Sequence, residues 1–216
     1  MSKKREINHS DLVQIKPITD NQKDVFKTGK AGKNQFLCGC AGTGKTFISL
    51  YLAFNEVLKN ETLYDKVIVV RSLIPTREIG FLPGDEEDKA ALYQVPYANM
   101  VQFIFKQPNE QAFSILYDRL KAQGSLYFLS TSFLRGLTFD NAIIIVDECQ
   151  NLNFHELDTI ITRVGQDSKI VFCGDFMQTD LTRQAEKNGL HDFTKILEEM
   201  DEFNVTEFTI GDIVRS

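Results

Sequence analysis

The sequence predicts an α/β fold, in which a mainly parallel β-sheet is covered by helices on both faces. Short apolar runs typical of buried strands alternate along the chain with longer runs of helical periodicity. Residues 142–146 form an almost unbroken β-branched run, which is typical of a parallel strand without an exposed face. A glycine-rich loop separates one of these strands from the helix that follows it. Together these observations predict a single α/β core.

The N-terminal elements lead into the glycine-rich loop. Thr19 predicts a helix N-cap, Gln22 at the third helical position would complete a capping box with it, and Gly29 ends the helix. A short apolar strand is then expected over 34–38. The helix expected over 45–59 is apolar on most faces, so we expect it to be covered on more than one side.

The middle of the chain predicts a strand, a long loop and two helices. The β-branched run at 66–70 is typical of a buried strand. The glycines and prolines within 71–88 predict a loop. Residues 88–121 have the composition of two helices that separate near Pro108, and a strand is expected over 125–129.

The C-terminal elements continue the alternation after the strand over 142–146. A helix is expected over 154–164, because its apolar residues fall on one face between a cap at Asn153 and a stop at Gly165. The remaining expected elements are a strand over 169–173, a helix over 190–200 and a last strand over 203–210.

The length of 216 residues is enough for one large domain with a substantial core. We expect a flexible N-terminal arm over residues 1–16 and a single domain over 17–216. No run of 18 apolar residues occurs, and the polar N-terminus lacks the apolar segment of a secretory signal. These features predict a cytoplasmic protein with no membrane partner.

The cysteines support the same compartment, because none forms a C-x-x-C pair and free thiols are the rule in a reducing cytoplasm. All of them fall on or beside predicted strand ends, where cysteine serves as a small buried side chain. Redox control of nucleotide binding is the alternative. The residues concerned are Cys38, Cys40, Cys149 and Cys173.

The charge distribution limits the partners. A net charge of -6 excludes a strongly basic nucleic-acid coat, but it leaves room for a local basic groove. Residues 1–33 carry eight basic and four acidic side chains. This segment is either a solvated tail with its helix or an arm that touches a polyanion.

Residues 39–46 match the pattern G-x-x-x-x-G-K-[ST] between a predicted strand and a predicted helix, which is the context this motif requires. Glycines let the backbone N–H groups face phosphate oxygens, and the helix N-terminus adds positive potential. Lys45 would reach the β- and γ-phosphates, and the Thr46 hydroxyl would ligate Mg²⁺. This phosphate loop consists of Gly39, Cys40, Ala41, Gly42, Thr43, Gly44, Lys45 and Thr46.

The strand over 142–146 ends in two carboxylates, Asp147 and Glu148. Downstream of a phosphate loop, Asp147 is placed to hold Mg²⁺, through water, and Glu148 to act as the general base that polarises an attacking water. Such a glutamate points to hydrolysis of a nucleoside triphosphate more than to a small-molecule kinase. Taken alone, an acidic strand end is also an ordinary loop start.

Other polar residues are weaker candidates. Gln178 or Asp175 could sense a γ-phosphate, because both follow a predicted strand at the edge where α/β ligands bind; the alternative is a plain loop. Gln22 could pair with an adenine edge, or simply serve in the capping box. Four arginines could complete a transition state or could be surface residues: Arg135, Arg163, Arg183 and Arg215.

Together these motifs resemble the PhoH family, the phosphate-starvation-inducible ATPases related to superfamily-one helicases. The resemblance runs from about Pro17 to Arg215, and its most specific parts are the Phe-Leu-Pro-Gly run, the Asp-Glu-x-Gln-Asn box and the Gly-Asp-x-x-Gln-x-Asp-Leu box. The matching segments are 19–22, 39–46, 80–85, 134–136, 146–151, 163–165, 174–181 and 212–215.

The resemblance implies a single helicase-like ATPase core that uses ATP and Mg²⁺. It implies that Gln22 reads adenine, that Gln150 couples the γ-phosphate to the nucleic-acid face, that Gln178 is the helicase sensor and that Arg215 is the arginine of the closing Asp-x-Val-Arg motif. Cys149 stands where the family usually carries alanine, and it is small enough to fit.

Superfamily-one helicases build their active site between two cores, whereas this length has room for one. An arginine finger from outside the core can be worth about 10³–10⁵ in rate. We therefore expect self-association in a ring, with Arg183 or Arg215 lent to a neighbour, and the family resemblance points to a hexamer.

A nucleic-acid partner is the weaker inference. Arg71, Arg77 and Lys89 could contact a strand, with Phe81 and Phe133 available for base stacking; the alternative is surface charge and packing. The favoured function is an ATP-hydrolysing motor or remodelling factor acting on single-stranded RNA or DNA, with RNA preferred. The alternative is a slow ATP-dependent switch or scaffold with a protein partner, and a small-molecule kinase ranks third.

Overall fold

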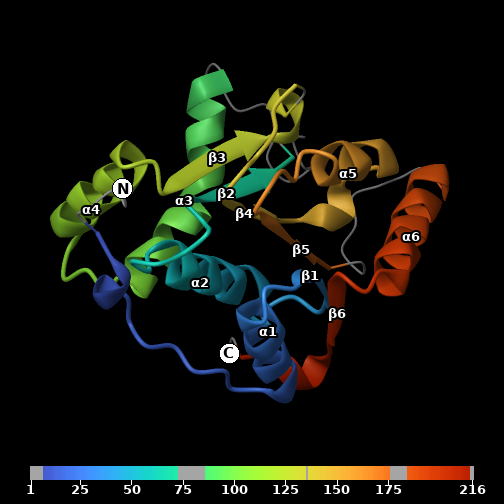
Figure 1. Ribbon diagram of the computed structural model, residues 1–216, viewed down its shortest axis with the longest axis horizontal. Coiled ribbons are helices and arrows are strands. Elements are labelled where there is room, and N and C mark those ends of the chain that lie inside the picture. The colour runs from blue at the N-terminus through green and yellow to red at the C-terminus, as the bar shows by residue number, and fades with distance from the viewer. Residues whose placement is uncertain (1–6, 73–85, 135, 176–183, 215–216) are drawn as a thin grey trace.

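The protein forms a six-stranded, all-parallel sheet flanked by helices (Figure 1). The computed structural model describes residues 7–72, 86–134, 136–175 and 184–214. The strand order across the sheet is β3-β2-β4-β5-β1-β6. The strands are β1 (Asn34–Gly39), β2 (Lys66–Arg71), β3 (Leu126–Ser130), β4 (Ala142–Val146), β5 (Lys169–Gly174) and β6 (Phe203–Phe208).

Helices connect most of the successive parallel strands, although α1 precedes β1 and the described residues between β3 and β4 contain only a 3₁₀ turn. Single turns of 3₁₀ helix occur at His9–Asp11, Thr131–Phe133, Cys149–Asn151 and Ile210–Asp212. In the part of the chain that is described, no helix combines the length and the apolar character needed to cross a bilayer. The α-helices are α1 (Asp20–Lys30), α2 (Lys45–Val57), α3 (Glu86–Ile104), α4 (Glu110–Ala122), α5 (Phe154–Ile161) and α6 (Gln184–Glu199).

Every strand and helix expected from the sequence is present, and the differences lie at their ends. Helix α6 begins at Gln184, earlier than the expected residue 190. Helix α3 continues through Pro96, so proline does not divide this segment there. The last strand stops at Phe208 because a 3₁₀ turn follows at Ile210–Asp212.

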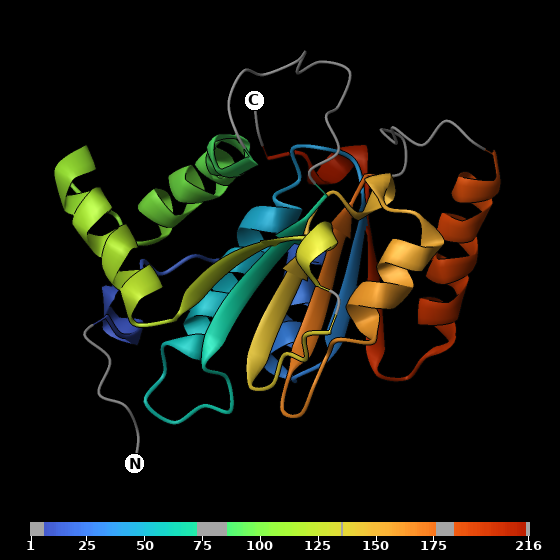
Figure 2. The same cartoon turned by 90° about the horizontal axis from the view of Figure 1, so that it is seen from above.

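The sheet separates two apolar cores, because successive side chains of a strand point to opposite faces. In β4, Ile143 and Ile145 face one core, while Ile144 and Val146 face the other. Helices α1 to α4 cover the first face, and α5 and α6 cover the second (Figure 2). Because both faces of every central strand are covered, the strands are apolar throughout, which is why the fold class could be predicted.

Part of the segment expected to be a flexible arm, from Ile7 to Val13, contacts the rest of the protein. Ile7 is buried against the α1–α4 face. The backbone N–H of His9 donates to the carbonyl of Leu58 at 3.0 Å, and that of Val13 donates to the carbonyl of Ile104 at 2.9 Å. This segment therefore crosses the ends of α2 and α3, which only the folded chain brings together.

Substitution of Phe172 on β5 tests the packing of the core under α5 and α6. Phe172 is fully buried, and its ring lies 5.4 Å from that of Phe193 and 6.3 Å from that of Phe203. We expect Phe172→Ala to lower the free energy of unfolding by about 3–5 kcal/mol, because it removes apolar contacts and leaves a cavity. Ile196→Ala, at a half-exposed position on α6, should cost about 0.5 kcal/mol or less. Equal losses in denaturant titrations of the two variants would contradict this packing.

Candidate nucleotide-binding site

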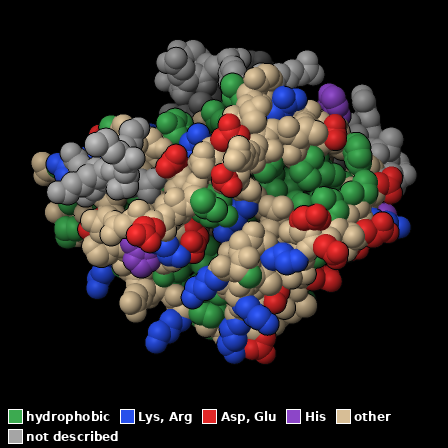
Figure 3. Space-filling model, viewed as in Figure 1, with side chains coloured by type: hydrophobic (Ala, Val, Ile, Leu, Met, Phe, Trp, Pro, Cys, Tyr) green, Lys and Arg blue, Asp and Glu red, His purple; other side chains and the backbone are tan. Residues whose placement is uncertain are grey.

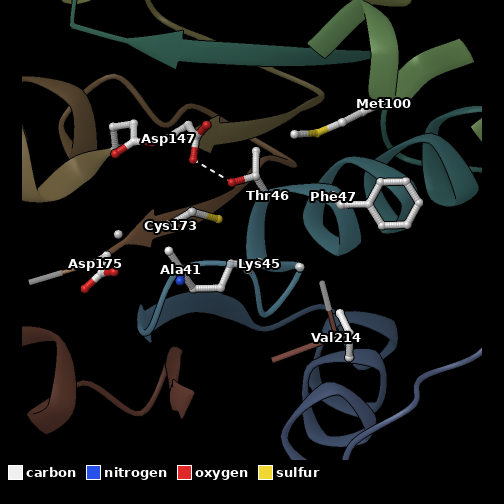
Figure 4. A pocket seen from close by; sticks show the side chains of 13 residues that line it. Ala41, Lys45, Thr46, Phe47, Met100, Asp147, Cys173, Asp175 and Val214 are labelled. Atoms are coloured by element: carbon white, nitrogen blue, oxygen red, sulfur yellow. Dashed lines mark hydrogen bonds between the residues drawn. The ribbon is translucent and has the colours of Figure 1, made fainter. Parts of the chain in front are cut away.

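A cleft of about 480 Å³ opens where β1, β4 and β5 end (Figure 4). Strand β5 lies between β4 and β1, so its own carboxyl end at Cys173 and Gly174 lies between the ends of these two strands. Ligands of open α/β sheets bind at this edge. The cleft is lined by Ala41, Gly42, Gly44, Lys45, Thr46, Phe47, Met100, Asp147, Glu148, Cys173, Gly174, Asp175 and Val214.

The phosphate loop needs its glycines for backbone reasons. Gly39, Gly42 and Gly44 have φ of 116°, 77° and 85°, the left-handed region that favours glycine. A Cβ on Gly39 would also lie 2.0 Å from the carbonyl oxygen of Phe208, its partner where β1 pairs with β6. Helix α2 starts at Lys45 with no side-chain cap, which leaves the positive end of its dipole at the cleft.

Lys45 lies inside the loop. Its ammonium donates to the carbonyl oxygens of Gly39 and Cys40, both at 2.7 Å. Thr43 is fully buried, and its hydroxyl donates to the carbonyl of Cys40 at 2.9 Å. The loop is therefore held in its curled form by its own side chains, and its lysine is already on the cleft side.

Thr46 and Asp147 meet in the cleft although they belong to different motifs. The Thr46 hydroxyl donates to Oδ1 of Asp147 at 2.7 Å (Figure 4). A hydroxyl and a carboxylate oxygen are hard oxygen ligands of the kind that Mg²⁺ prefers. The donor set therefore fits a magnesium site beside the phosphate loop.

Glu148 is held by Gln150. The Gln150 side-chain amide donates to Oε2 of Glu148 at 2.5 Å, and its carbonyl oxygen accepts from the backbone N–H of Asp175 at 3.0 Å. Glu148 itself has the left-handed φ of 53°. Gly174 must be small, because a Cβ there would lie 2.6 Å from the sulfur of Cys149. Gln150 thus joins the acidic strand end to the end of β5.

Gln22 contacts the phosphate loop. Its side-chain amide donates to the carbonyl of Thr43 at 3.1 Å, and its carbonyl oxygen accepts from the backbone N–H of Ile18 at 2.8 Å. Thr19 caps α1, because its side-chain oxygen accepts a hydrogen bond from the backbone N–H of Gln22. The Gln22 side chain bonds to the N–H of Ile18 and not to that of Thr19, so the expected capping box is not completed. Contact between Gln22 and adenine stays a prediction.

The closing motif packs on the other side of the same loop. The backbone N–H of Val214 donates to the carbonyl of Gly42 at 3.2 Å. Asp212 is buried and accepts from the side chain of Asn21 at 2.8 Å and from the backbone N–H of Thr209 at 2.9 Å. Burial opposes the charge of Asp212, but hydrogen bonds from Thr19, Thr209 and Asn21 outweigh it and lower its pKa.

Sequence reasoning missed Tyr97. This residue of α3 is buried, and its hydroxyl donates to Oδ2 of Asp147 at 2.8 Å. Met100 of the same helix and Phe47 of α2 line the cleft and were also missed. An apolar or aromatic residue within a helix carries no local signal that separates a cleft position from a core position.

Three of the cysteines are buried beside the cleft. Burial raises the pKa of Cys38 to about 11 and raises those of Cys149 and Cys173 well above their ordinary value. These thiols therefore stay protonated near neutral pH and lack the thiolate that oxidants attack. Cys40 is partly exposed on the phosphate loop. The packing role of cysteine is favoured over redox control.

Several predicted residues lie outside what the structure describes. Of the nucleic-acid candidates, Arg71 is described: it is partly buried at the end of β2, 5.6 Å from the centre of the Tyr93 ring. Arg163 is also described, at the turn after α5. The residues outside the described ranges are Arg77, Phe81, Arg135, Gln178, Arg183 and Arg215, and the side chains of Lys89 and Phe133 are likewise outside them.

This combination of parallel sheet, phosphate loop and acidic strand end defines a P-loop NTPase with a RecA-like core. A structure search supports the fold. A large terminase from a thermophilic bacteriophage superposes with a TM-score of 0.51 at 12% identity, covering 93% of this chain and 48% of that one. A second crystal form of that terminase gives 0.50 at 13% identity, covering 92% and 47%.

The sequence comparisons show the family. The family model described as PhoH-like protein matches residues 14–216, and the chain belongs to the PhoH family. A PhoH-like protein of Synechocystis is 32% identical over 93% of this chain and 58% of its own length. Protein PhoH of Escherichia coli is 31% identical over 97% and 54%, and protein PhoH2 of Bacillus subtilis 39% identical over 67% and 32%. The chain thus spans about half the length of most curated relatives it matches.

The lowered pKa of Asp212 predicts a pH-dependent contribution to stability. Its pKa lies below the ordinary 3.8, so its contribution is fully present above that pH and is lost as pH falls through the folded-state value. Asp212→Asn should lower the free energy of unfolding by about 1 kcal/mol at pH 7. The deficit should shrink in denaturant titrations as pH falls below 3.8. Asp20→Asn, whose side chain is 94% exposed, serves as the control; a deficit independent of pH would argue against a charged Asp212.

Proposed function

We propose that the protein binds ATP with Mg²⁺ and hydrolyses it. The observation that carries this proposal is the hydrogen bond between Thr46 and Asp147, which places two hard oxygen ligands beside the phosphate loop. Glu148 lines the same cleft, where Gln150 orients it. A nucleotide phosphate in this cleft would meet the N-terminus of α2 as well as Lys45.

Each residue then has a defined task. The ammonium of Lys45 offsets charge on the β- and γ-phosphates, and the loop N–H groups orient them. Bound Mg²⁺ would polarise the phosphate oxygens, and Thr46 and Asp147 would be the protein residues that hold it. Glu148 takes the proton of the attacking water, and Gln150 keeps the carboxylate of Glu148 turned towards the cleft. Gln22 reads adenine from the start of α1, and Gln178 senses the γ-phosphate.

Two variants separate binding from hydrolysis. Lys45→Ala should weaken nucleotide binding and lower the ATPase rate by about 100-fold or more, because it removes charge stabilisation of the transferring phosphoryl group. Glu148→Gln should lower the rate by about 10²–10⁴-fold and still bind ATP, because it removes only the base. Phosphate release and binding of a fluorescent nucleotide measure the two effects.

The controls for these variants are Lys195→Ala and Glu199→Gln, which change exposed residues of α6 that do not line the cleft. Both should match the wild-type protein. Undiminished turnover in Lys45→Ala and Glu148→Gln would overturn the assignment of the site.

We further propose that hydrolysis drives a motor or remodelling step on single-stranded nucleic acid, with RNA favoured over DNA. The resemblance to helicase-related ATPases supports this substrate. Arg71, at the carboxyl end of β2, is a basic residue near the cleft edge. Lysine and arginine side chains gather at the lower edge of the face in Figure 3, where α1 exposes Lys23, Lys27 and Lys30.

We propose that the active form is a homo-oligomer in the form of a hexameric ring. A single RecA-like core supplies one side of the γ-phosphate, so a neighbouring subunit would supply Arg183 or Arg215 as a finger. Val214, which precedes Arg215 in the sequence, lines the cleft.

Nucleic-acid stimulation and mass are measured together. RNA strands should raise the ATPase rate more than DNA strands do, and binding should weaken steeply between 50 and about 200 mM salt, because contacts to phosphates release counterions. Light scattering should give a mass several times 24.6 kDa. Full ATPase activity of a monomer at all concentrations would contradict the proposed ring. An ATPase rate that no RNA or DNA strand changes would contradict the proposed nucleic-acid substrate.

The second candidate function is a slow ATP-dependent switch or assembly scaffold with a protein partner. The net charge of -6 favours it, because an acidic protein attracts a polyanion only at local basic sites. The same experiment distinguishes the two: a slow basal rate that no strand changes, with nucleotide-dependent self-association, is the outcome expected of a switch.

A further inference from the structure

Both carboxylate oxygens of Asp147 are held by hydroxyl donors from different helices. Oδ1 accepts from Thr46 of α2 at 2.7 Å, and Oδ2 accepts from Tyr97 of α3 at 2.8 Å. Asp147 and Tyr97 are 7% and 2% exposed. Because a carboxylate turns readily about its last bond, two donors on opposite oxygens define its orientation where one would not.

Tyr97 is itself held firmly. Its ring lies 5.6 Å from that of Phe128 on β3, and the side chain is 2% exposed. The hydroxyl of Tyr97 carries one proton to donate, and it donates it to Oδ2 of Asp147. The hydroxyl of Tyr97 thus links α3 to the acidic end of β4.

We propose that Tyr97 is a positioning residue for the divalent-cation site. It holds Oδ2 so that Oδ1 stays directed at Thr46, which is where the cation would be bound. Groups that hydrogen-bond to a metal ligand fix the orientation of that ligand and strengthen metal binding. This inference rests on the proposed function, because it assigns a task to Tyr97 only if a cation binds between Thr46 and Asp147.

The contrary explanation is that Tyr97 merely fills the core beneath α3. Tyr117 of α4 is a matched control for it. Its ring lies 6.5 Å from that of the same Phe128, and its hydroxyl is buried with no hydrogen-bond partner among the described residues. Replacing either tyrosine by phenylalanine removes one buried oxygen and keeps the ring, but only Tyr97 touches Asp147.

The experiment compares wild-type protein, Tyr97→Phe and Tyr117→Phe as full chains. Binding of a fluorescent ADP analogue is measured in EDTA and across a titration of Mg²⁺, and circular dichroism and the metal-free melting temperature establish that each variant is folded. Tyr97→Phe should need about tenfold more Mg²⁺ for half-maximal enhancement of binding. Its nucleotide affinity in EDTA should stay within about twofold of wild type. Saturating Mg²⁺ should restore the wild-type nucleotide affinity, because the metal ligands themselves are intact.

Tyr117→Phe should follow the wild-type titration. The proposal is overturned if Tyr97→Phe titrates like wild type, if it loses affinity equally in EDTA, if excess Mg²⁺ does not rescue it, or if Tyr117→Phe shifts by the same factor. A wild-type protein whose nucleotide binding ignores Mg²⁺ would instead overturn the proposed function, so the two failures are distinguishable. The rise in melting temperature on adding Mg²⁺ and ADP gives a second readout, and it should be recovered in Tyr97→Phe only at the higher metal concentration.

Discussion

The hydrogen bond between Thr46 and Asp147 joins the first turn of α2 to the end of β4, across 101 positions of the chain. It can form only because all six strands run parallel, so that the carboxyl ends of β1, β4 and β5 reach the same edge of the sheet. Helices on both faces make that topology possible by burying every central strand. The cleft is therefore a consequence of the sheet and its crossovers.

A second constraint acts on the phosphate loop from outside. Gln22, at the start of α1, accepts a hydrogen bond from Ile18 and donates one to Thr43. The backbone N–H of Val214 donates to Gly42. Asp212 and Asn21 link these two segments to each other. A loop whose glycines could adopt many conformations is thereby held in one, which lowers the entropy cost of organising it around phosphate.

The acidic strand end is organised in the same way, by residues from other elements. Gln150 connects Glu148 to the backbone after β5, and Tyr97 connects Asp147 to α3. Asp147 and Glu148 thus depend on different supports, one in the helical layer and one in the sheet. Polar groups buried at this depth need such partners, since an unpaired buried carboxylate is costly.

What the sequence by itself determined was the order of strands and helices, the phosphate loop, and the acidic pair at the end of β4. These are local: β-branched runs, glycine spacing and helix caps depend on residues a few positions apart, and the chemistry of phosphate binding demands them in a fixed order. Gln150 was reached only through resemblance, because a glutamine after a strand has no meaning until its partners are known.

Only the tertiary structure decided the partners of these groups. It showed that Tyr97 holds Asp147, that Gln22 contacts Thr43 instead of completing a capping box, and that residues from Ile7 onward dock where the sequence predicts a loose arm. Each of these contacts joins elements that are separate along the chain, and their approach is set by packing against a common sheet. Local sequence patterns carry no record of such distances, so these contacts could be read only from the folded chain.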